Sequence, residues 1–188
     1  MTRRRFSRDD WVALGLAELS ANGAEAVKLE AICAAANLTR GSFYHHFADH
    51  ESFLVALADA WHRTQTQDVA SAIDPDAPAA QQDAALTEAA MAIDYRLELG
   101  IREVGRRRPA VAQIVRDADD LRLDVLTSLY CQRFALDDAT ARNCAHLEYA
   151  AFSGIILLDP DMDRDRQLEL AALYDRMIRA ALGGDAPA

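Results

Sequence analysis

The sequence predicts an all-α protein, and three observations support this. Apolar residues recur at the three- and four-residue spacing of a helix along most of the 188 residues. The 8 glycines and 5 prolines fall mainly where such a pattern ends. No segment shows the alternation typical of a half-buried strand, and there is no internal repeat. We expect about nine helices, over residues 8–22, 29–36, 40–46, 50–72, 80–106, 109–116, 118–134, 138–158 and 164–182.

Capping residues define the first four helices. Ser7, with an acid three residues later, has the pattern of a capping box, and Gly23 follows the first helix as a stop. Asn tolerates a left-handed backbone, so Asn37 suits a sharp turn. Thr39 and Asp49 are good N-caps for the third and fourth helices. The apolar positions on one side of the fourth helix are Phe53, Leu54, Leu57 and Trp61.

Breaks and apolar stripes define the remaining helices. Residues 74–78, with two prolines, form a linker or turn. The long helix over 80–106 ends in three arginines before Pro109, where the helix dipole favours positive charge. Its apolar stripe consists of Leu86, Ala90, Ile93, Leu97, Ile101 and Val104. Asp137 caps the helix over 138–158, and Gly183 with the glycine after it ends the last helix.

The charge is unevenly distributed. The formal net charge is −10, from 20 basic and 30 acidic residues. Residues 1–50 hold six of each, so the remaining chain holds 14 basic and 24 acidic residues and carries the whole net charge. Only the N-terminal part is therefore suited to meet a polyanion such as DNA.

Composition excludes several classes of protein. A hydrophobic fraction of 51% and a charged fraction of 27% are ordinary for a globular protein. The uncharged stretch 149–158 is too short to cross a bilayer. No apolar signal region follows the N-terminal arginines. We therefore expect a cytoplasmic protein without a membrane partner. The three cysteines lack C-x-x-C spacing, which argues against a zinc site and a disulfide framework; they are expected to be small buried hydrophobes. They are Cys33, Cys131 and Cys144.

The segment 29–46 has the pattern of a helix-turn-helix. Two short helices flank the three-residue turn 37–39. The second helix is unusual for a packing helix, because several hydrogen-bond donors and a tyrosine hydroxyl fall within a few residues. In this motif the second helix lies in the major groove of DNA.

Residues 8–55 resemble the DNA-binding domain of the tetracycline-repressor (TetR) family of bacterial transcriptional regulators. The matching run is Ala35–Leu54, in which the turn, the pair of aromatic residues and the following helix cap agree together. Beyond it, the chain resembles the family only in its helix pattern. The resemblance implies a DNA-binding domain over residues 1–55 and a ligand-binding and dimerisation domain over residues 56–188. It further implies a homodimer that binds a palindromic operator and responds to a small molecule of unknown identity.

The resemblance also implies roles for individual residues. Thr39 would cap the recognition helix and donate to a phosphate, while Arg40 and Ser42 would contact base edges. Gly41 would let the backbone approach DNA closely, and Tyr44 would donate to a phosphate. The implied DNA-contacting residues are Arg3, Arg4, Arg5, Lys28, Thr39, Arg40, Gly41, Ser42, Tyr44, His45 and His50. Phe43 and Phe47 would instead pack inward.

Three positions depart from the family pattern. Lys28 stands where the family usually has a Ser or Thr cap, so it can meet a phosphate but cannot cap with an oxygen. Asn37 replaces a glycine, which is a benign change. His50 replaces a lysine, which makes a phosphate contact pH-sensitive. The arginines at 3–5 are interpreted either as a DNA-contacting arm or as a solvated tail.

No metal or cofactor is expected. His45 and His46 are adjacent and point in different directions, and no acid or thiol completes a ligand set around them. For the effector, large or mixed-polarity side chains on the C-terminal helices are pocket candidates, although such residues often just fill a core. They are Trp61, Met91, Tyr95, Tyr130, His146, Tyr149 and Phe152.

The last two helices are the predicted dimer interface. Small residues along 138–158 permit close helix approach, and 164–182 carries a wide apolar stripe. Two helices from each subunit would form an isologous four-helix interface.

Two other functions compete with a ligand-released repressor. A constitutive or architectural DNA-binding regulator would have no effector cavity and no ligand-linked stabilisation. An enzyme is disfavoured, because the sequence has no paired Glu-x-x-His motifs, no G-x-S-x-G and no phosphate-binding loop.

Overall fold

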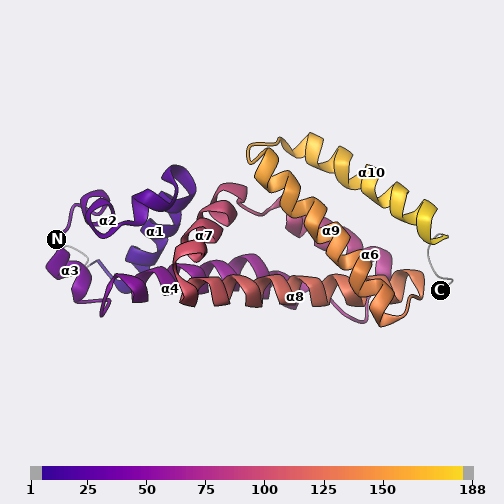
Figure 1. The fold of residues 1–188 in the computed structure, drawn as a ribbon, viewed down its shortest axis with the longest axis horizontal. Coiled ribbons are helices and arrows are strands. Elements are labelled where there is room, and N and C mark those ends of the chain that lie inside the picture. Colours follow the sequence, from indigo (N-terminus) through magenta and orange to yellow (C-terminus); the bar gives the residue numbers. More distant parts are fainter. Residues whose placement is uncertain (1–5, 184–188) are drawn as a thin grey trace. The chain divides into compact units, whose positions relative to one another are not determined.

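The computed structural model describes residues 6–183 and is all-α in that range. Figure 1 shows the described helices. Their bounds are α1 Arg8–Asn22, α2 Leu29–Ala35, α3 Arg40–Tyr44, α4 His50–His62, α5 Asp68–Ala72, α6 Ala79–Met91, α7 Tyr95–Arg107, α8 Pro109–Phe134, α9 Asp138–Leu158 and α10 Arg164–Leu182. A 3-10 turn, Ala24–Val27, precedes α2, and a π-helical turn, Arg63–Gln67, separates α4 from α5.

The chain forms two compact units. The first consists of Met1–Thr64 with Asp94–Asp117, and the second of Gln65–Ile93 with Ala118–Ala188. The first unit therefore holds more of the chain than the 1–55 expected from the sequence. It includes α7, which comes from the middle of the chain.

Aromatic rings form the core of the first unit. Phe43 lies at its centre, with ring centroids 5.4 Å from Trp11, 5.1 Å from Phe47 and 5.3 Å from Phe53. All four residues are buried. The edge-to-face and tilted arrangements place ring edges against ring faces, which aromatic pairs prefer. α1, α3 and α4 are thereby held together around one cluster.

Glycines set how closely α1 packs against its neighbours. A Cβ atom on Gly15 of α1 would lie 2.7 Å from side-chain atoms of Phe53 and Leu57, so α4 approaches α1 only because this side chain is absent. A Cβ atom on Gly100 of α7 would lie 2.8 Å from Leu19 of α1. The first unit is therefore closely packed on both sides of α1.

A buried carboxylate ties α4 to α7. Glu98 is only 1% exposed; it accepts a hydrogen bond from Trp61 Nε1 at 3.1 Å and from Arg102 Nε at 2.9 Å. The Arg102 guanidinium also forms an ion pair with it at 2.7 Å. A buried charge is tolerated when it is paired and hydrogen-bonded in this way.

The second unit has its core between α8 and α9. The buried cluster consists of Leu123, Leu126, Tyr130, Phe134, Ala141 and Ala145, and partly buried residues of α6 and α10 pack against it. α10 itself contains no buried residue. Part of its apolar stripe lies open, with Leu173 44% and Met177 60% exposed.

The helix boundaries differ from expectation in the middle of the chain. The predicted helix 80–106 is two helices, because Asp94 caps a new one by accepting from the backbone N–H of Leu97 at 3.0 Å. Residues 109–116 and 118–134 form the single helix α8. The predicted helix 50–72 is interrupted by the π-helical turn, and the 3-10 turn before α2 was not predicted. Among the described residues, no helix has the length and apolarity needed to span a membrane.

Candidate nucleic-acid interface and ligand cavity

The turn between α2 and α3 has the geometry that its residues predict. Asn37 has a φ of 52°, in the left-handed region. Thr39 is the N-cap of α3, and its side-chain oxygen accepts from the backbone N–H of Ser42 at 3.3 Å. Both expectations are confirmed. These two residues fix the direction in which α3 leaves the turn.

The two faces of the recognition helix differ completely. Phe43 is 0% and Phe47 3% exposed, as expected for residues that hold the helix on its partners. On the other face Tyr44 is 49% exposed. Arg40, Gly41 and His45 are also exposed, while Ser42 is half-buried. The aromatic anchors thus leave a row of polar groups open to a large partner.

A contact inside the protein orients one of these groups, and another has no side chain. The Arg40 guanidinium forms an exposed ion pair with Glu30 of α2. A Cβ atom on Gly41 would meet only the Thr39 hydroxyl, at 3.7 Å, so nothing inside the unit requires glycine here. A missing side chain on this exposed face fits close approach by an external partner.

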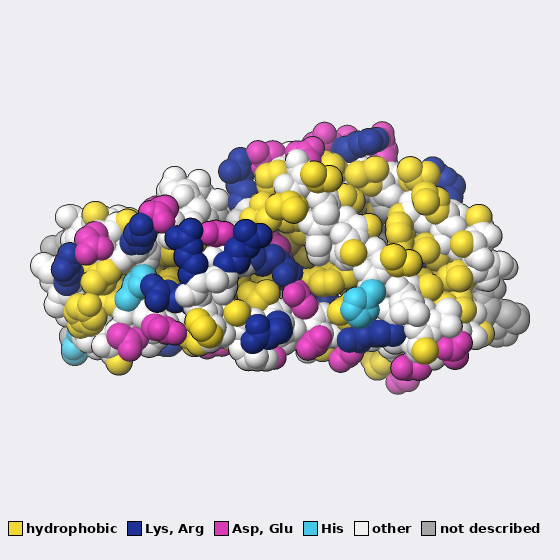
Figure 2. Space-filling model, viewed as in Figure 1, with side chains coloured by type: hydrophobic (Ala, Val, Ile, Leu, Met, Phe, Trp, Pro, Cys, Tyr) yellow, Lys and Arg dark blue, Asp and Glu magenta, His cyan; other side chains and the backbone are white. Residues whose placement is uncertain are grey.

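Lys28 and His50 lie in a groove of the first unit. Lys28 is the N-cap of α2 without a side-chain hydrogen bond to the helix, as expected, and pairs instead with Glu25. A ring nitrogen of His50, Nε2, lies 2.8 Å from the carbonyl oxygen of Val27. Two arginines that were not predicted as contacts line the same groove, Arg107 at the end of α7 and Arg108 directly after it. Figure 2 shows Lys and Arg side chains close together on this unit. Arg3, Arg4 and Arg5 lie outside the described residues.

The second unit contains an apolar cavity of about 110 Å³. The π-helical turn, α5, α6, α8 and α9 all contribute side chains to its wall. The lining residues are Gln65, Thr66, Val69, Ala70, Ile73, Leu86, Ala89, Ala90, Ile93, Leu121, Arg122, Val125, Leu126, Glu148, Tyr149 and Phe152. Apolar walls with few polar groups are typical of small-molecule sites.

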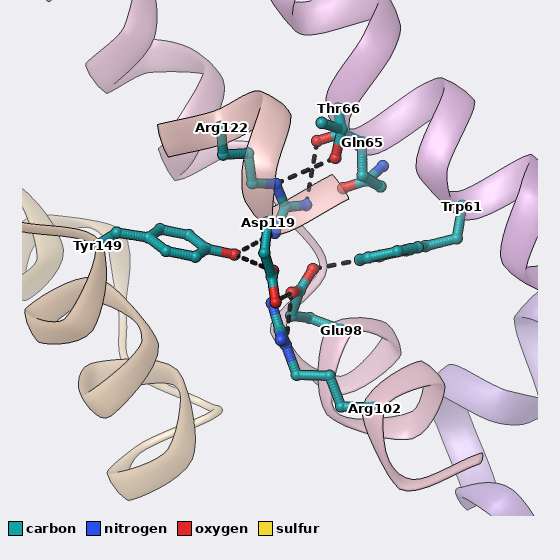
Figure 3. A network of polar contacts seen from close by, with 8 residues as sticks. All are labelled: Trp61, Gln65, Thr66, Glu98, Arg102, Asp119, Arg122 and Tyr149. Atoms are coloured by element: carbon teal, nitrogen blue, oxygen red, sulfur yellow. Dashed lines mark hydrogen bonds and ion pairs between the residues drawn. The ribbon is translucent and has the colours of Figure 1, made fainter. Parts of the chain in front are cut away.

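Arg122 is the centre of the polar part of this wall (Figure 3). Its Nε donates to the Thr66 hydroxyl at 3.0 Å, and one terminal nitrogen, Nη2, donates to the Gln65 carbonyl oxygen at 3.3 Å. The other, Nη1, donates to the Tyr149 hydroxyl at 3.0 Å. That hydroxyl in turn donates to the Asp119 carboxylate at 2.6 Å.

Glu148 is the second ionisable group of the wall. The Tyr130 hydroxyl donates to its carboxylate at 2.7 Å and lies 3.5 Å from the Tyr174 hydroxyl. Burial raises the pKa of Glu148 above its ordinary value, and the nearby carboxylates of Asp83 and Asp175 act in the same direction. The hydrogen bond from Tyr130 and the charge of Arg133 oppose this shift.

The structure brings only two of the seven ligand candidates to this cavity, Tyr149 and Phe152. Their rings are nearly parallel, with centroids 6.3 Å apart. Trp61 and Tyr95 are buried in the first unit, and Tyr130 belongs to the core of the second. Met91 is half-buried and His146 is exposed; neither lines the cavity. His146 and Tyr149 therefore do not act together on this wall.

Arg122 was missed, although the sequence holds a signal for it. It occupies the second position of an apolar stripe at helical spacing, whose other members are Ala118, Val125, Leu126 and Leu129. A charged residue on a core-facing stripe indicates a buried polar contact or a binding site.

Comparison with known proteins agrees with this architecture. Residues 12–57 match the family model of bacterial regulatory proteins, tetR family. No curated protein matches the chain in sequence. A transcriptional regulator of Rhodococcus sp. Rha1 has a similar structure, with a TM-score of 0.80 and 15% identity over 97% of this chain and 100% of that one.

Two further solved structures are similar. A TetR transcriptional regulator from Legionella pneumophila gives a TM-score of 0.73 at 18% identity, covering 89% of this chain and 94% of its own. The multidrug binding protein EbrR, complexed with imidazole, gives 0.59 at 19% identity, covering 88% and 92%. At these identities the likeness shows a shared fold.

The fold and the exposed face of α3 define a class of protein, the helix-turn-helix DNA-binding transcriptional regulators, rather than an enzyme. Its N-terminal domain, residues 12–57, matches the TetR family of bacterial regulatory proteins.

Proposed function

We propose that the protein is a homodimeric repressor that binds a palindromic operator and leaves it when a small molecule enters the cavity of the second unit. The observation that carries this proposal is the two-faced helix α3. Buried Phe43 and Phe47 fix the helix, and Arg40 and Tyr44 project from it into solvent. Because its partner would be chromosomal DNA, the place of action would be the cytoplasm.

In this proposal, Arg40 and Ser42 contact base edges, and Thr39 and Tyr44 contact phosphates. An exposed arginine can bind guanine O6 and N7 with two parallel hydrogen bonds. Gly41, His45, Lys28 and His50 would complete the interface. His50 would reach a phosphate through the ring nitrogen that does not face Val27.

The exposed apolar residues of α9 and α10 support the dimer. Leu147 is 69%, Leu157 66% and Met177 60% exposed. Several large apolar side chains exposed on the same two helices are consistent with an interaction site. A two-fold dimer has the symmetry of a palindromic operator, whose half-sites lie about 34 Å apart, one turn of DNA.

The cavity supports an effector rather than constitutive binding. It is apolar, with a small polar cluster at Arg122, as in small-molecule sites. The related fold of EbrR holds imidazole. A ligand that binds one arrangement of the protein better than the other would shift the population between them and so change DNA affinity.

The test is binding of the purified protein to its upstream intergenic DNA, beside Arg40→Ala and Tyr44→Ala. Arg40→Ala should weaken the operator by about 1–3 kcal/mol and relax specificity at one position, whereas Tyr44→Ala should weaken all sequences alike. Arg116→Ala, which removes an exposed cation of α8, is the matched control and should bind as wild type. Protection of a palindrome that neither variant weakens would refute the proposed role of α3.

A further inference from the structure

The polar cluster of the cavity indicates which charge the effector carries, an inference that rests on the proposed function. We propose that the cavity binds a small apolar carboxylate, whose carboxylate group takes over the two Arg122 donors that now hold Thr66 and Gln65. The ligand would be an aromatic or short aliphatic acid. Its apolar body would lie against Val125 and Phe152.

The hydrogen bonds of Arg122 have the geometry that a carboxylate uses. Nε and Nη2 lie on one edge of the guanidinium, and they donate to Thr66 Oγ1 and the Gln65 carbonyl. Both acceptors are neutral. A carboxylate presents two oxygens in the same parallel arrangement and forms stronger, charge-assisted hydrogen bonds. Replacement of the two neutral acceptors of Arg122 by a ligand carboxylate therefore favours the ligand-bound state.

Glu148 is a poorer anchor for a cationic ligand than Arg122 is for an anion. Its carboxylate already accepts from the Tyr130 hydroxyl at 2.7 Å, and burial raises its pKa, which weakens its negative charge. A guanidinium keeps its charge at every pH that the protein survives. Tyr149 remains on Nη1 of Arg122 and connects it to Asp119, which holds the guanidinium in position during the exchange.

The volume limits the size of the ligand. A cavity of about 150 Å³ lined by aliphatic side chains holds one benzene ring. The cavity here measures about 110 Å³, with Ile73, Leu86 and Ile93 among its walls. This is less than the volume that holds benzene, so one ring or a short aliphatic chain is the upper limit for the apolar body, and a polycyclic ligand is too large.

The exchange has a consequence for the π-helical turn Arg63–Gln67. Arg122 donates both to a side chain and to a backbone carbonyl of this turn. π-helical turns are rare and often occur at functional sites. A ligand that removes these two hydrogen bonds loosens the turn that connects α4 to α5. The effector would thus act first on the segment that follows the DNA-binding unit in the chain.

Ligand-observed ¹⁹F NMR with three ring-sized probes tests the charge. The probes are 4-fluorobenzoate, 4-fluorobenzyl alcohol and 4-fluorobenzylamine, which share a body and differ in charge. The full-length protein should bind the benzoate at least about tenfold more tightly than the alcohol, given the strength of hydrogen bonds to charged groups. Equal binding of benzoate and alcohol, preferential binding of the amine, or binding of none of the probes would overturn the proposal.

Variants assign the effect to Arg122. Arg122→Lys keeps the charge but loses the paired donors, and should reduce the benzoate preference several-fold; Arg122→Met should abolish it. Arg116→Met, at an exposed arginine of the same helix that does not line the cavity, is the matched control and should leave the benzoate preference unchanged. If Arg122→Met fails to fold, the lysine variant and the probe series in the wild type still decide the question.

Amide hydrogen exchange over residues 63–72 tests whether the ligand loosens the π-helical turn. Benzoate should increase amide exchange in this segment while decreasing it in α8, and unchanged exchange in a benzoate-saturated protein would overturn the release of the turn. DNA binding is measured separately. Operator binding with no carboxylate preference would refute this inference alone, whereas failure to bind any operator would refute the proposed function and leave the charge preference standing.

Discussion

The recognition helix α3 and the last helix α10 are held in opposite ways. α3 has 5 residues, and a fully buried phenylalanine at its centre packs among three other aromatic rings. α10 has 19 residues and buries none of them. Ile178 and Leu182 pack against the core while remaining partly exposed. Its other attachments include the ion pairs of Asp175 with Arg133 and of Arg164 with Glu88, the latter at 2.6 Å.

The difference indicates which surface of each helix is available to bind a partner. Packing inside its own chain fixes α3, so that its outer face is free for DNA. α10 leaves apolar side chains uncovered, so a further surface is needed to bury them.

Phe43→Ala should remove the anchor of α3. Truncation of a buried phenylalanine costs about 3–5 kcal/mol in the free energy of unfolding, from lost burial and the cavity left behind. Urea unfolding measures this cost. Tyr44→Ala, the adjacent exposed residue, should change stability by less than about 0.5 kcal/mol. Similar losses in both variants would contradict the division of α3 into an inner and an outer face.

Met177→Glu should disrupt the proposed dimer contact of α10. If the exposed apolar stripe lies in a dimer interface, a buried unpaired charge there costs about 2 kcal/mol or more and dissociates the dimer at micromolar concentration. Sedimentation equilibrium measures the change. Ser128→Glu, on the exposed face of α8, is the control for added charge. A wild-type monomer at all concentrations would refute the dimer.

Thr39→Ala should remove the N-cap of α3. Loss of such a cap costs about 1 kcal/mol. The helix is so short that its first turn should also become less ordered, and operator affinity should fall with stability. Thr39→Ser keeps the hydroxyl, and we expect it to restore both. A serine variant that behaves like the alanine variant would show that the methyl group matters instead.

Glu148→Gln should alter how stability depends on pH. The pKa of Glu148 is raised in the folded protein, so the folded state binds more protons than the unfolded state above pH 4.5. Its contribution to stability is therefore complete below pH 4.5 and is lost as pH rises toward the folded pKa. The glutamine variant should lose less stability over this range in urea titrations at several pH values. Glu169→Gln, exposed on α10, should follow the wild type.

Sequence reasoning predicted the first unit better than the second. Thr39 and Asp49 accept from backbone N–H groups three residues away, and Asn37 sets the backbone angle of its own turn. Their roles can therefore be inferred from the chain alone. The π-helical turn depends on packing, whereas the cap at the Asp94 break is local but was hidden by a continuous apolar stripe. The apolar spacing from Leu86 to Val104 continues across that break, although α6 and α7 belong to different units.

The cavity was the least predictable feature for the same reason. Arg122 binds Gln65 and Thr66, which lie more than fifty residues earlier in the chain, and no local pattern connects them. Residue size suggested Trp61 and Tyr95, but size alone does not distinguish a residue that fills a core from one that lines a cavity. Both lie in the core of the first unit.

The packing of Gly100 against Leu19 bears on how regulators of this kind can be recombined. A hybrid made by joining residues 1–64 to another effector module would lack α7, and the surface of α1 that receives it would be exposed. Trp61 would also lose the carboxylate to which it donates. A transplanted DNA-reading module must therefore carry residues 94–117 with it, or the new host must supply a helix with a glycine at the same crossing.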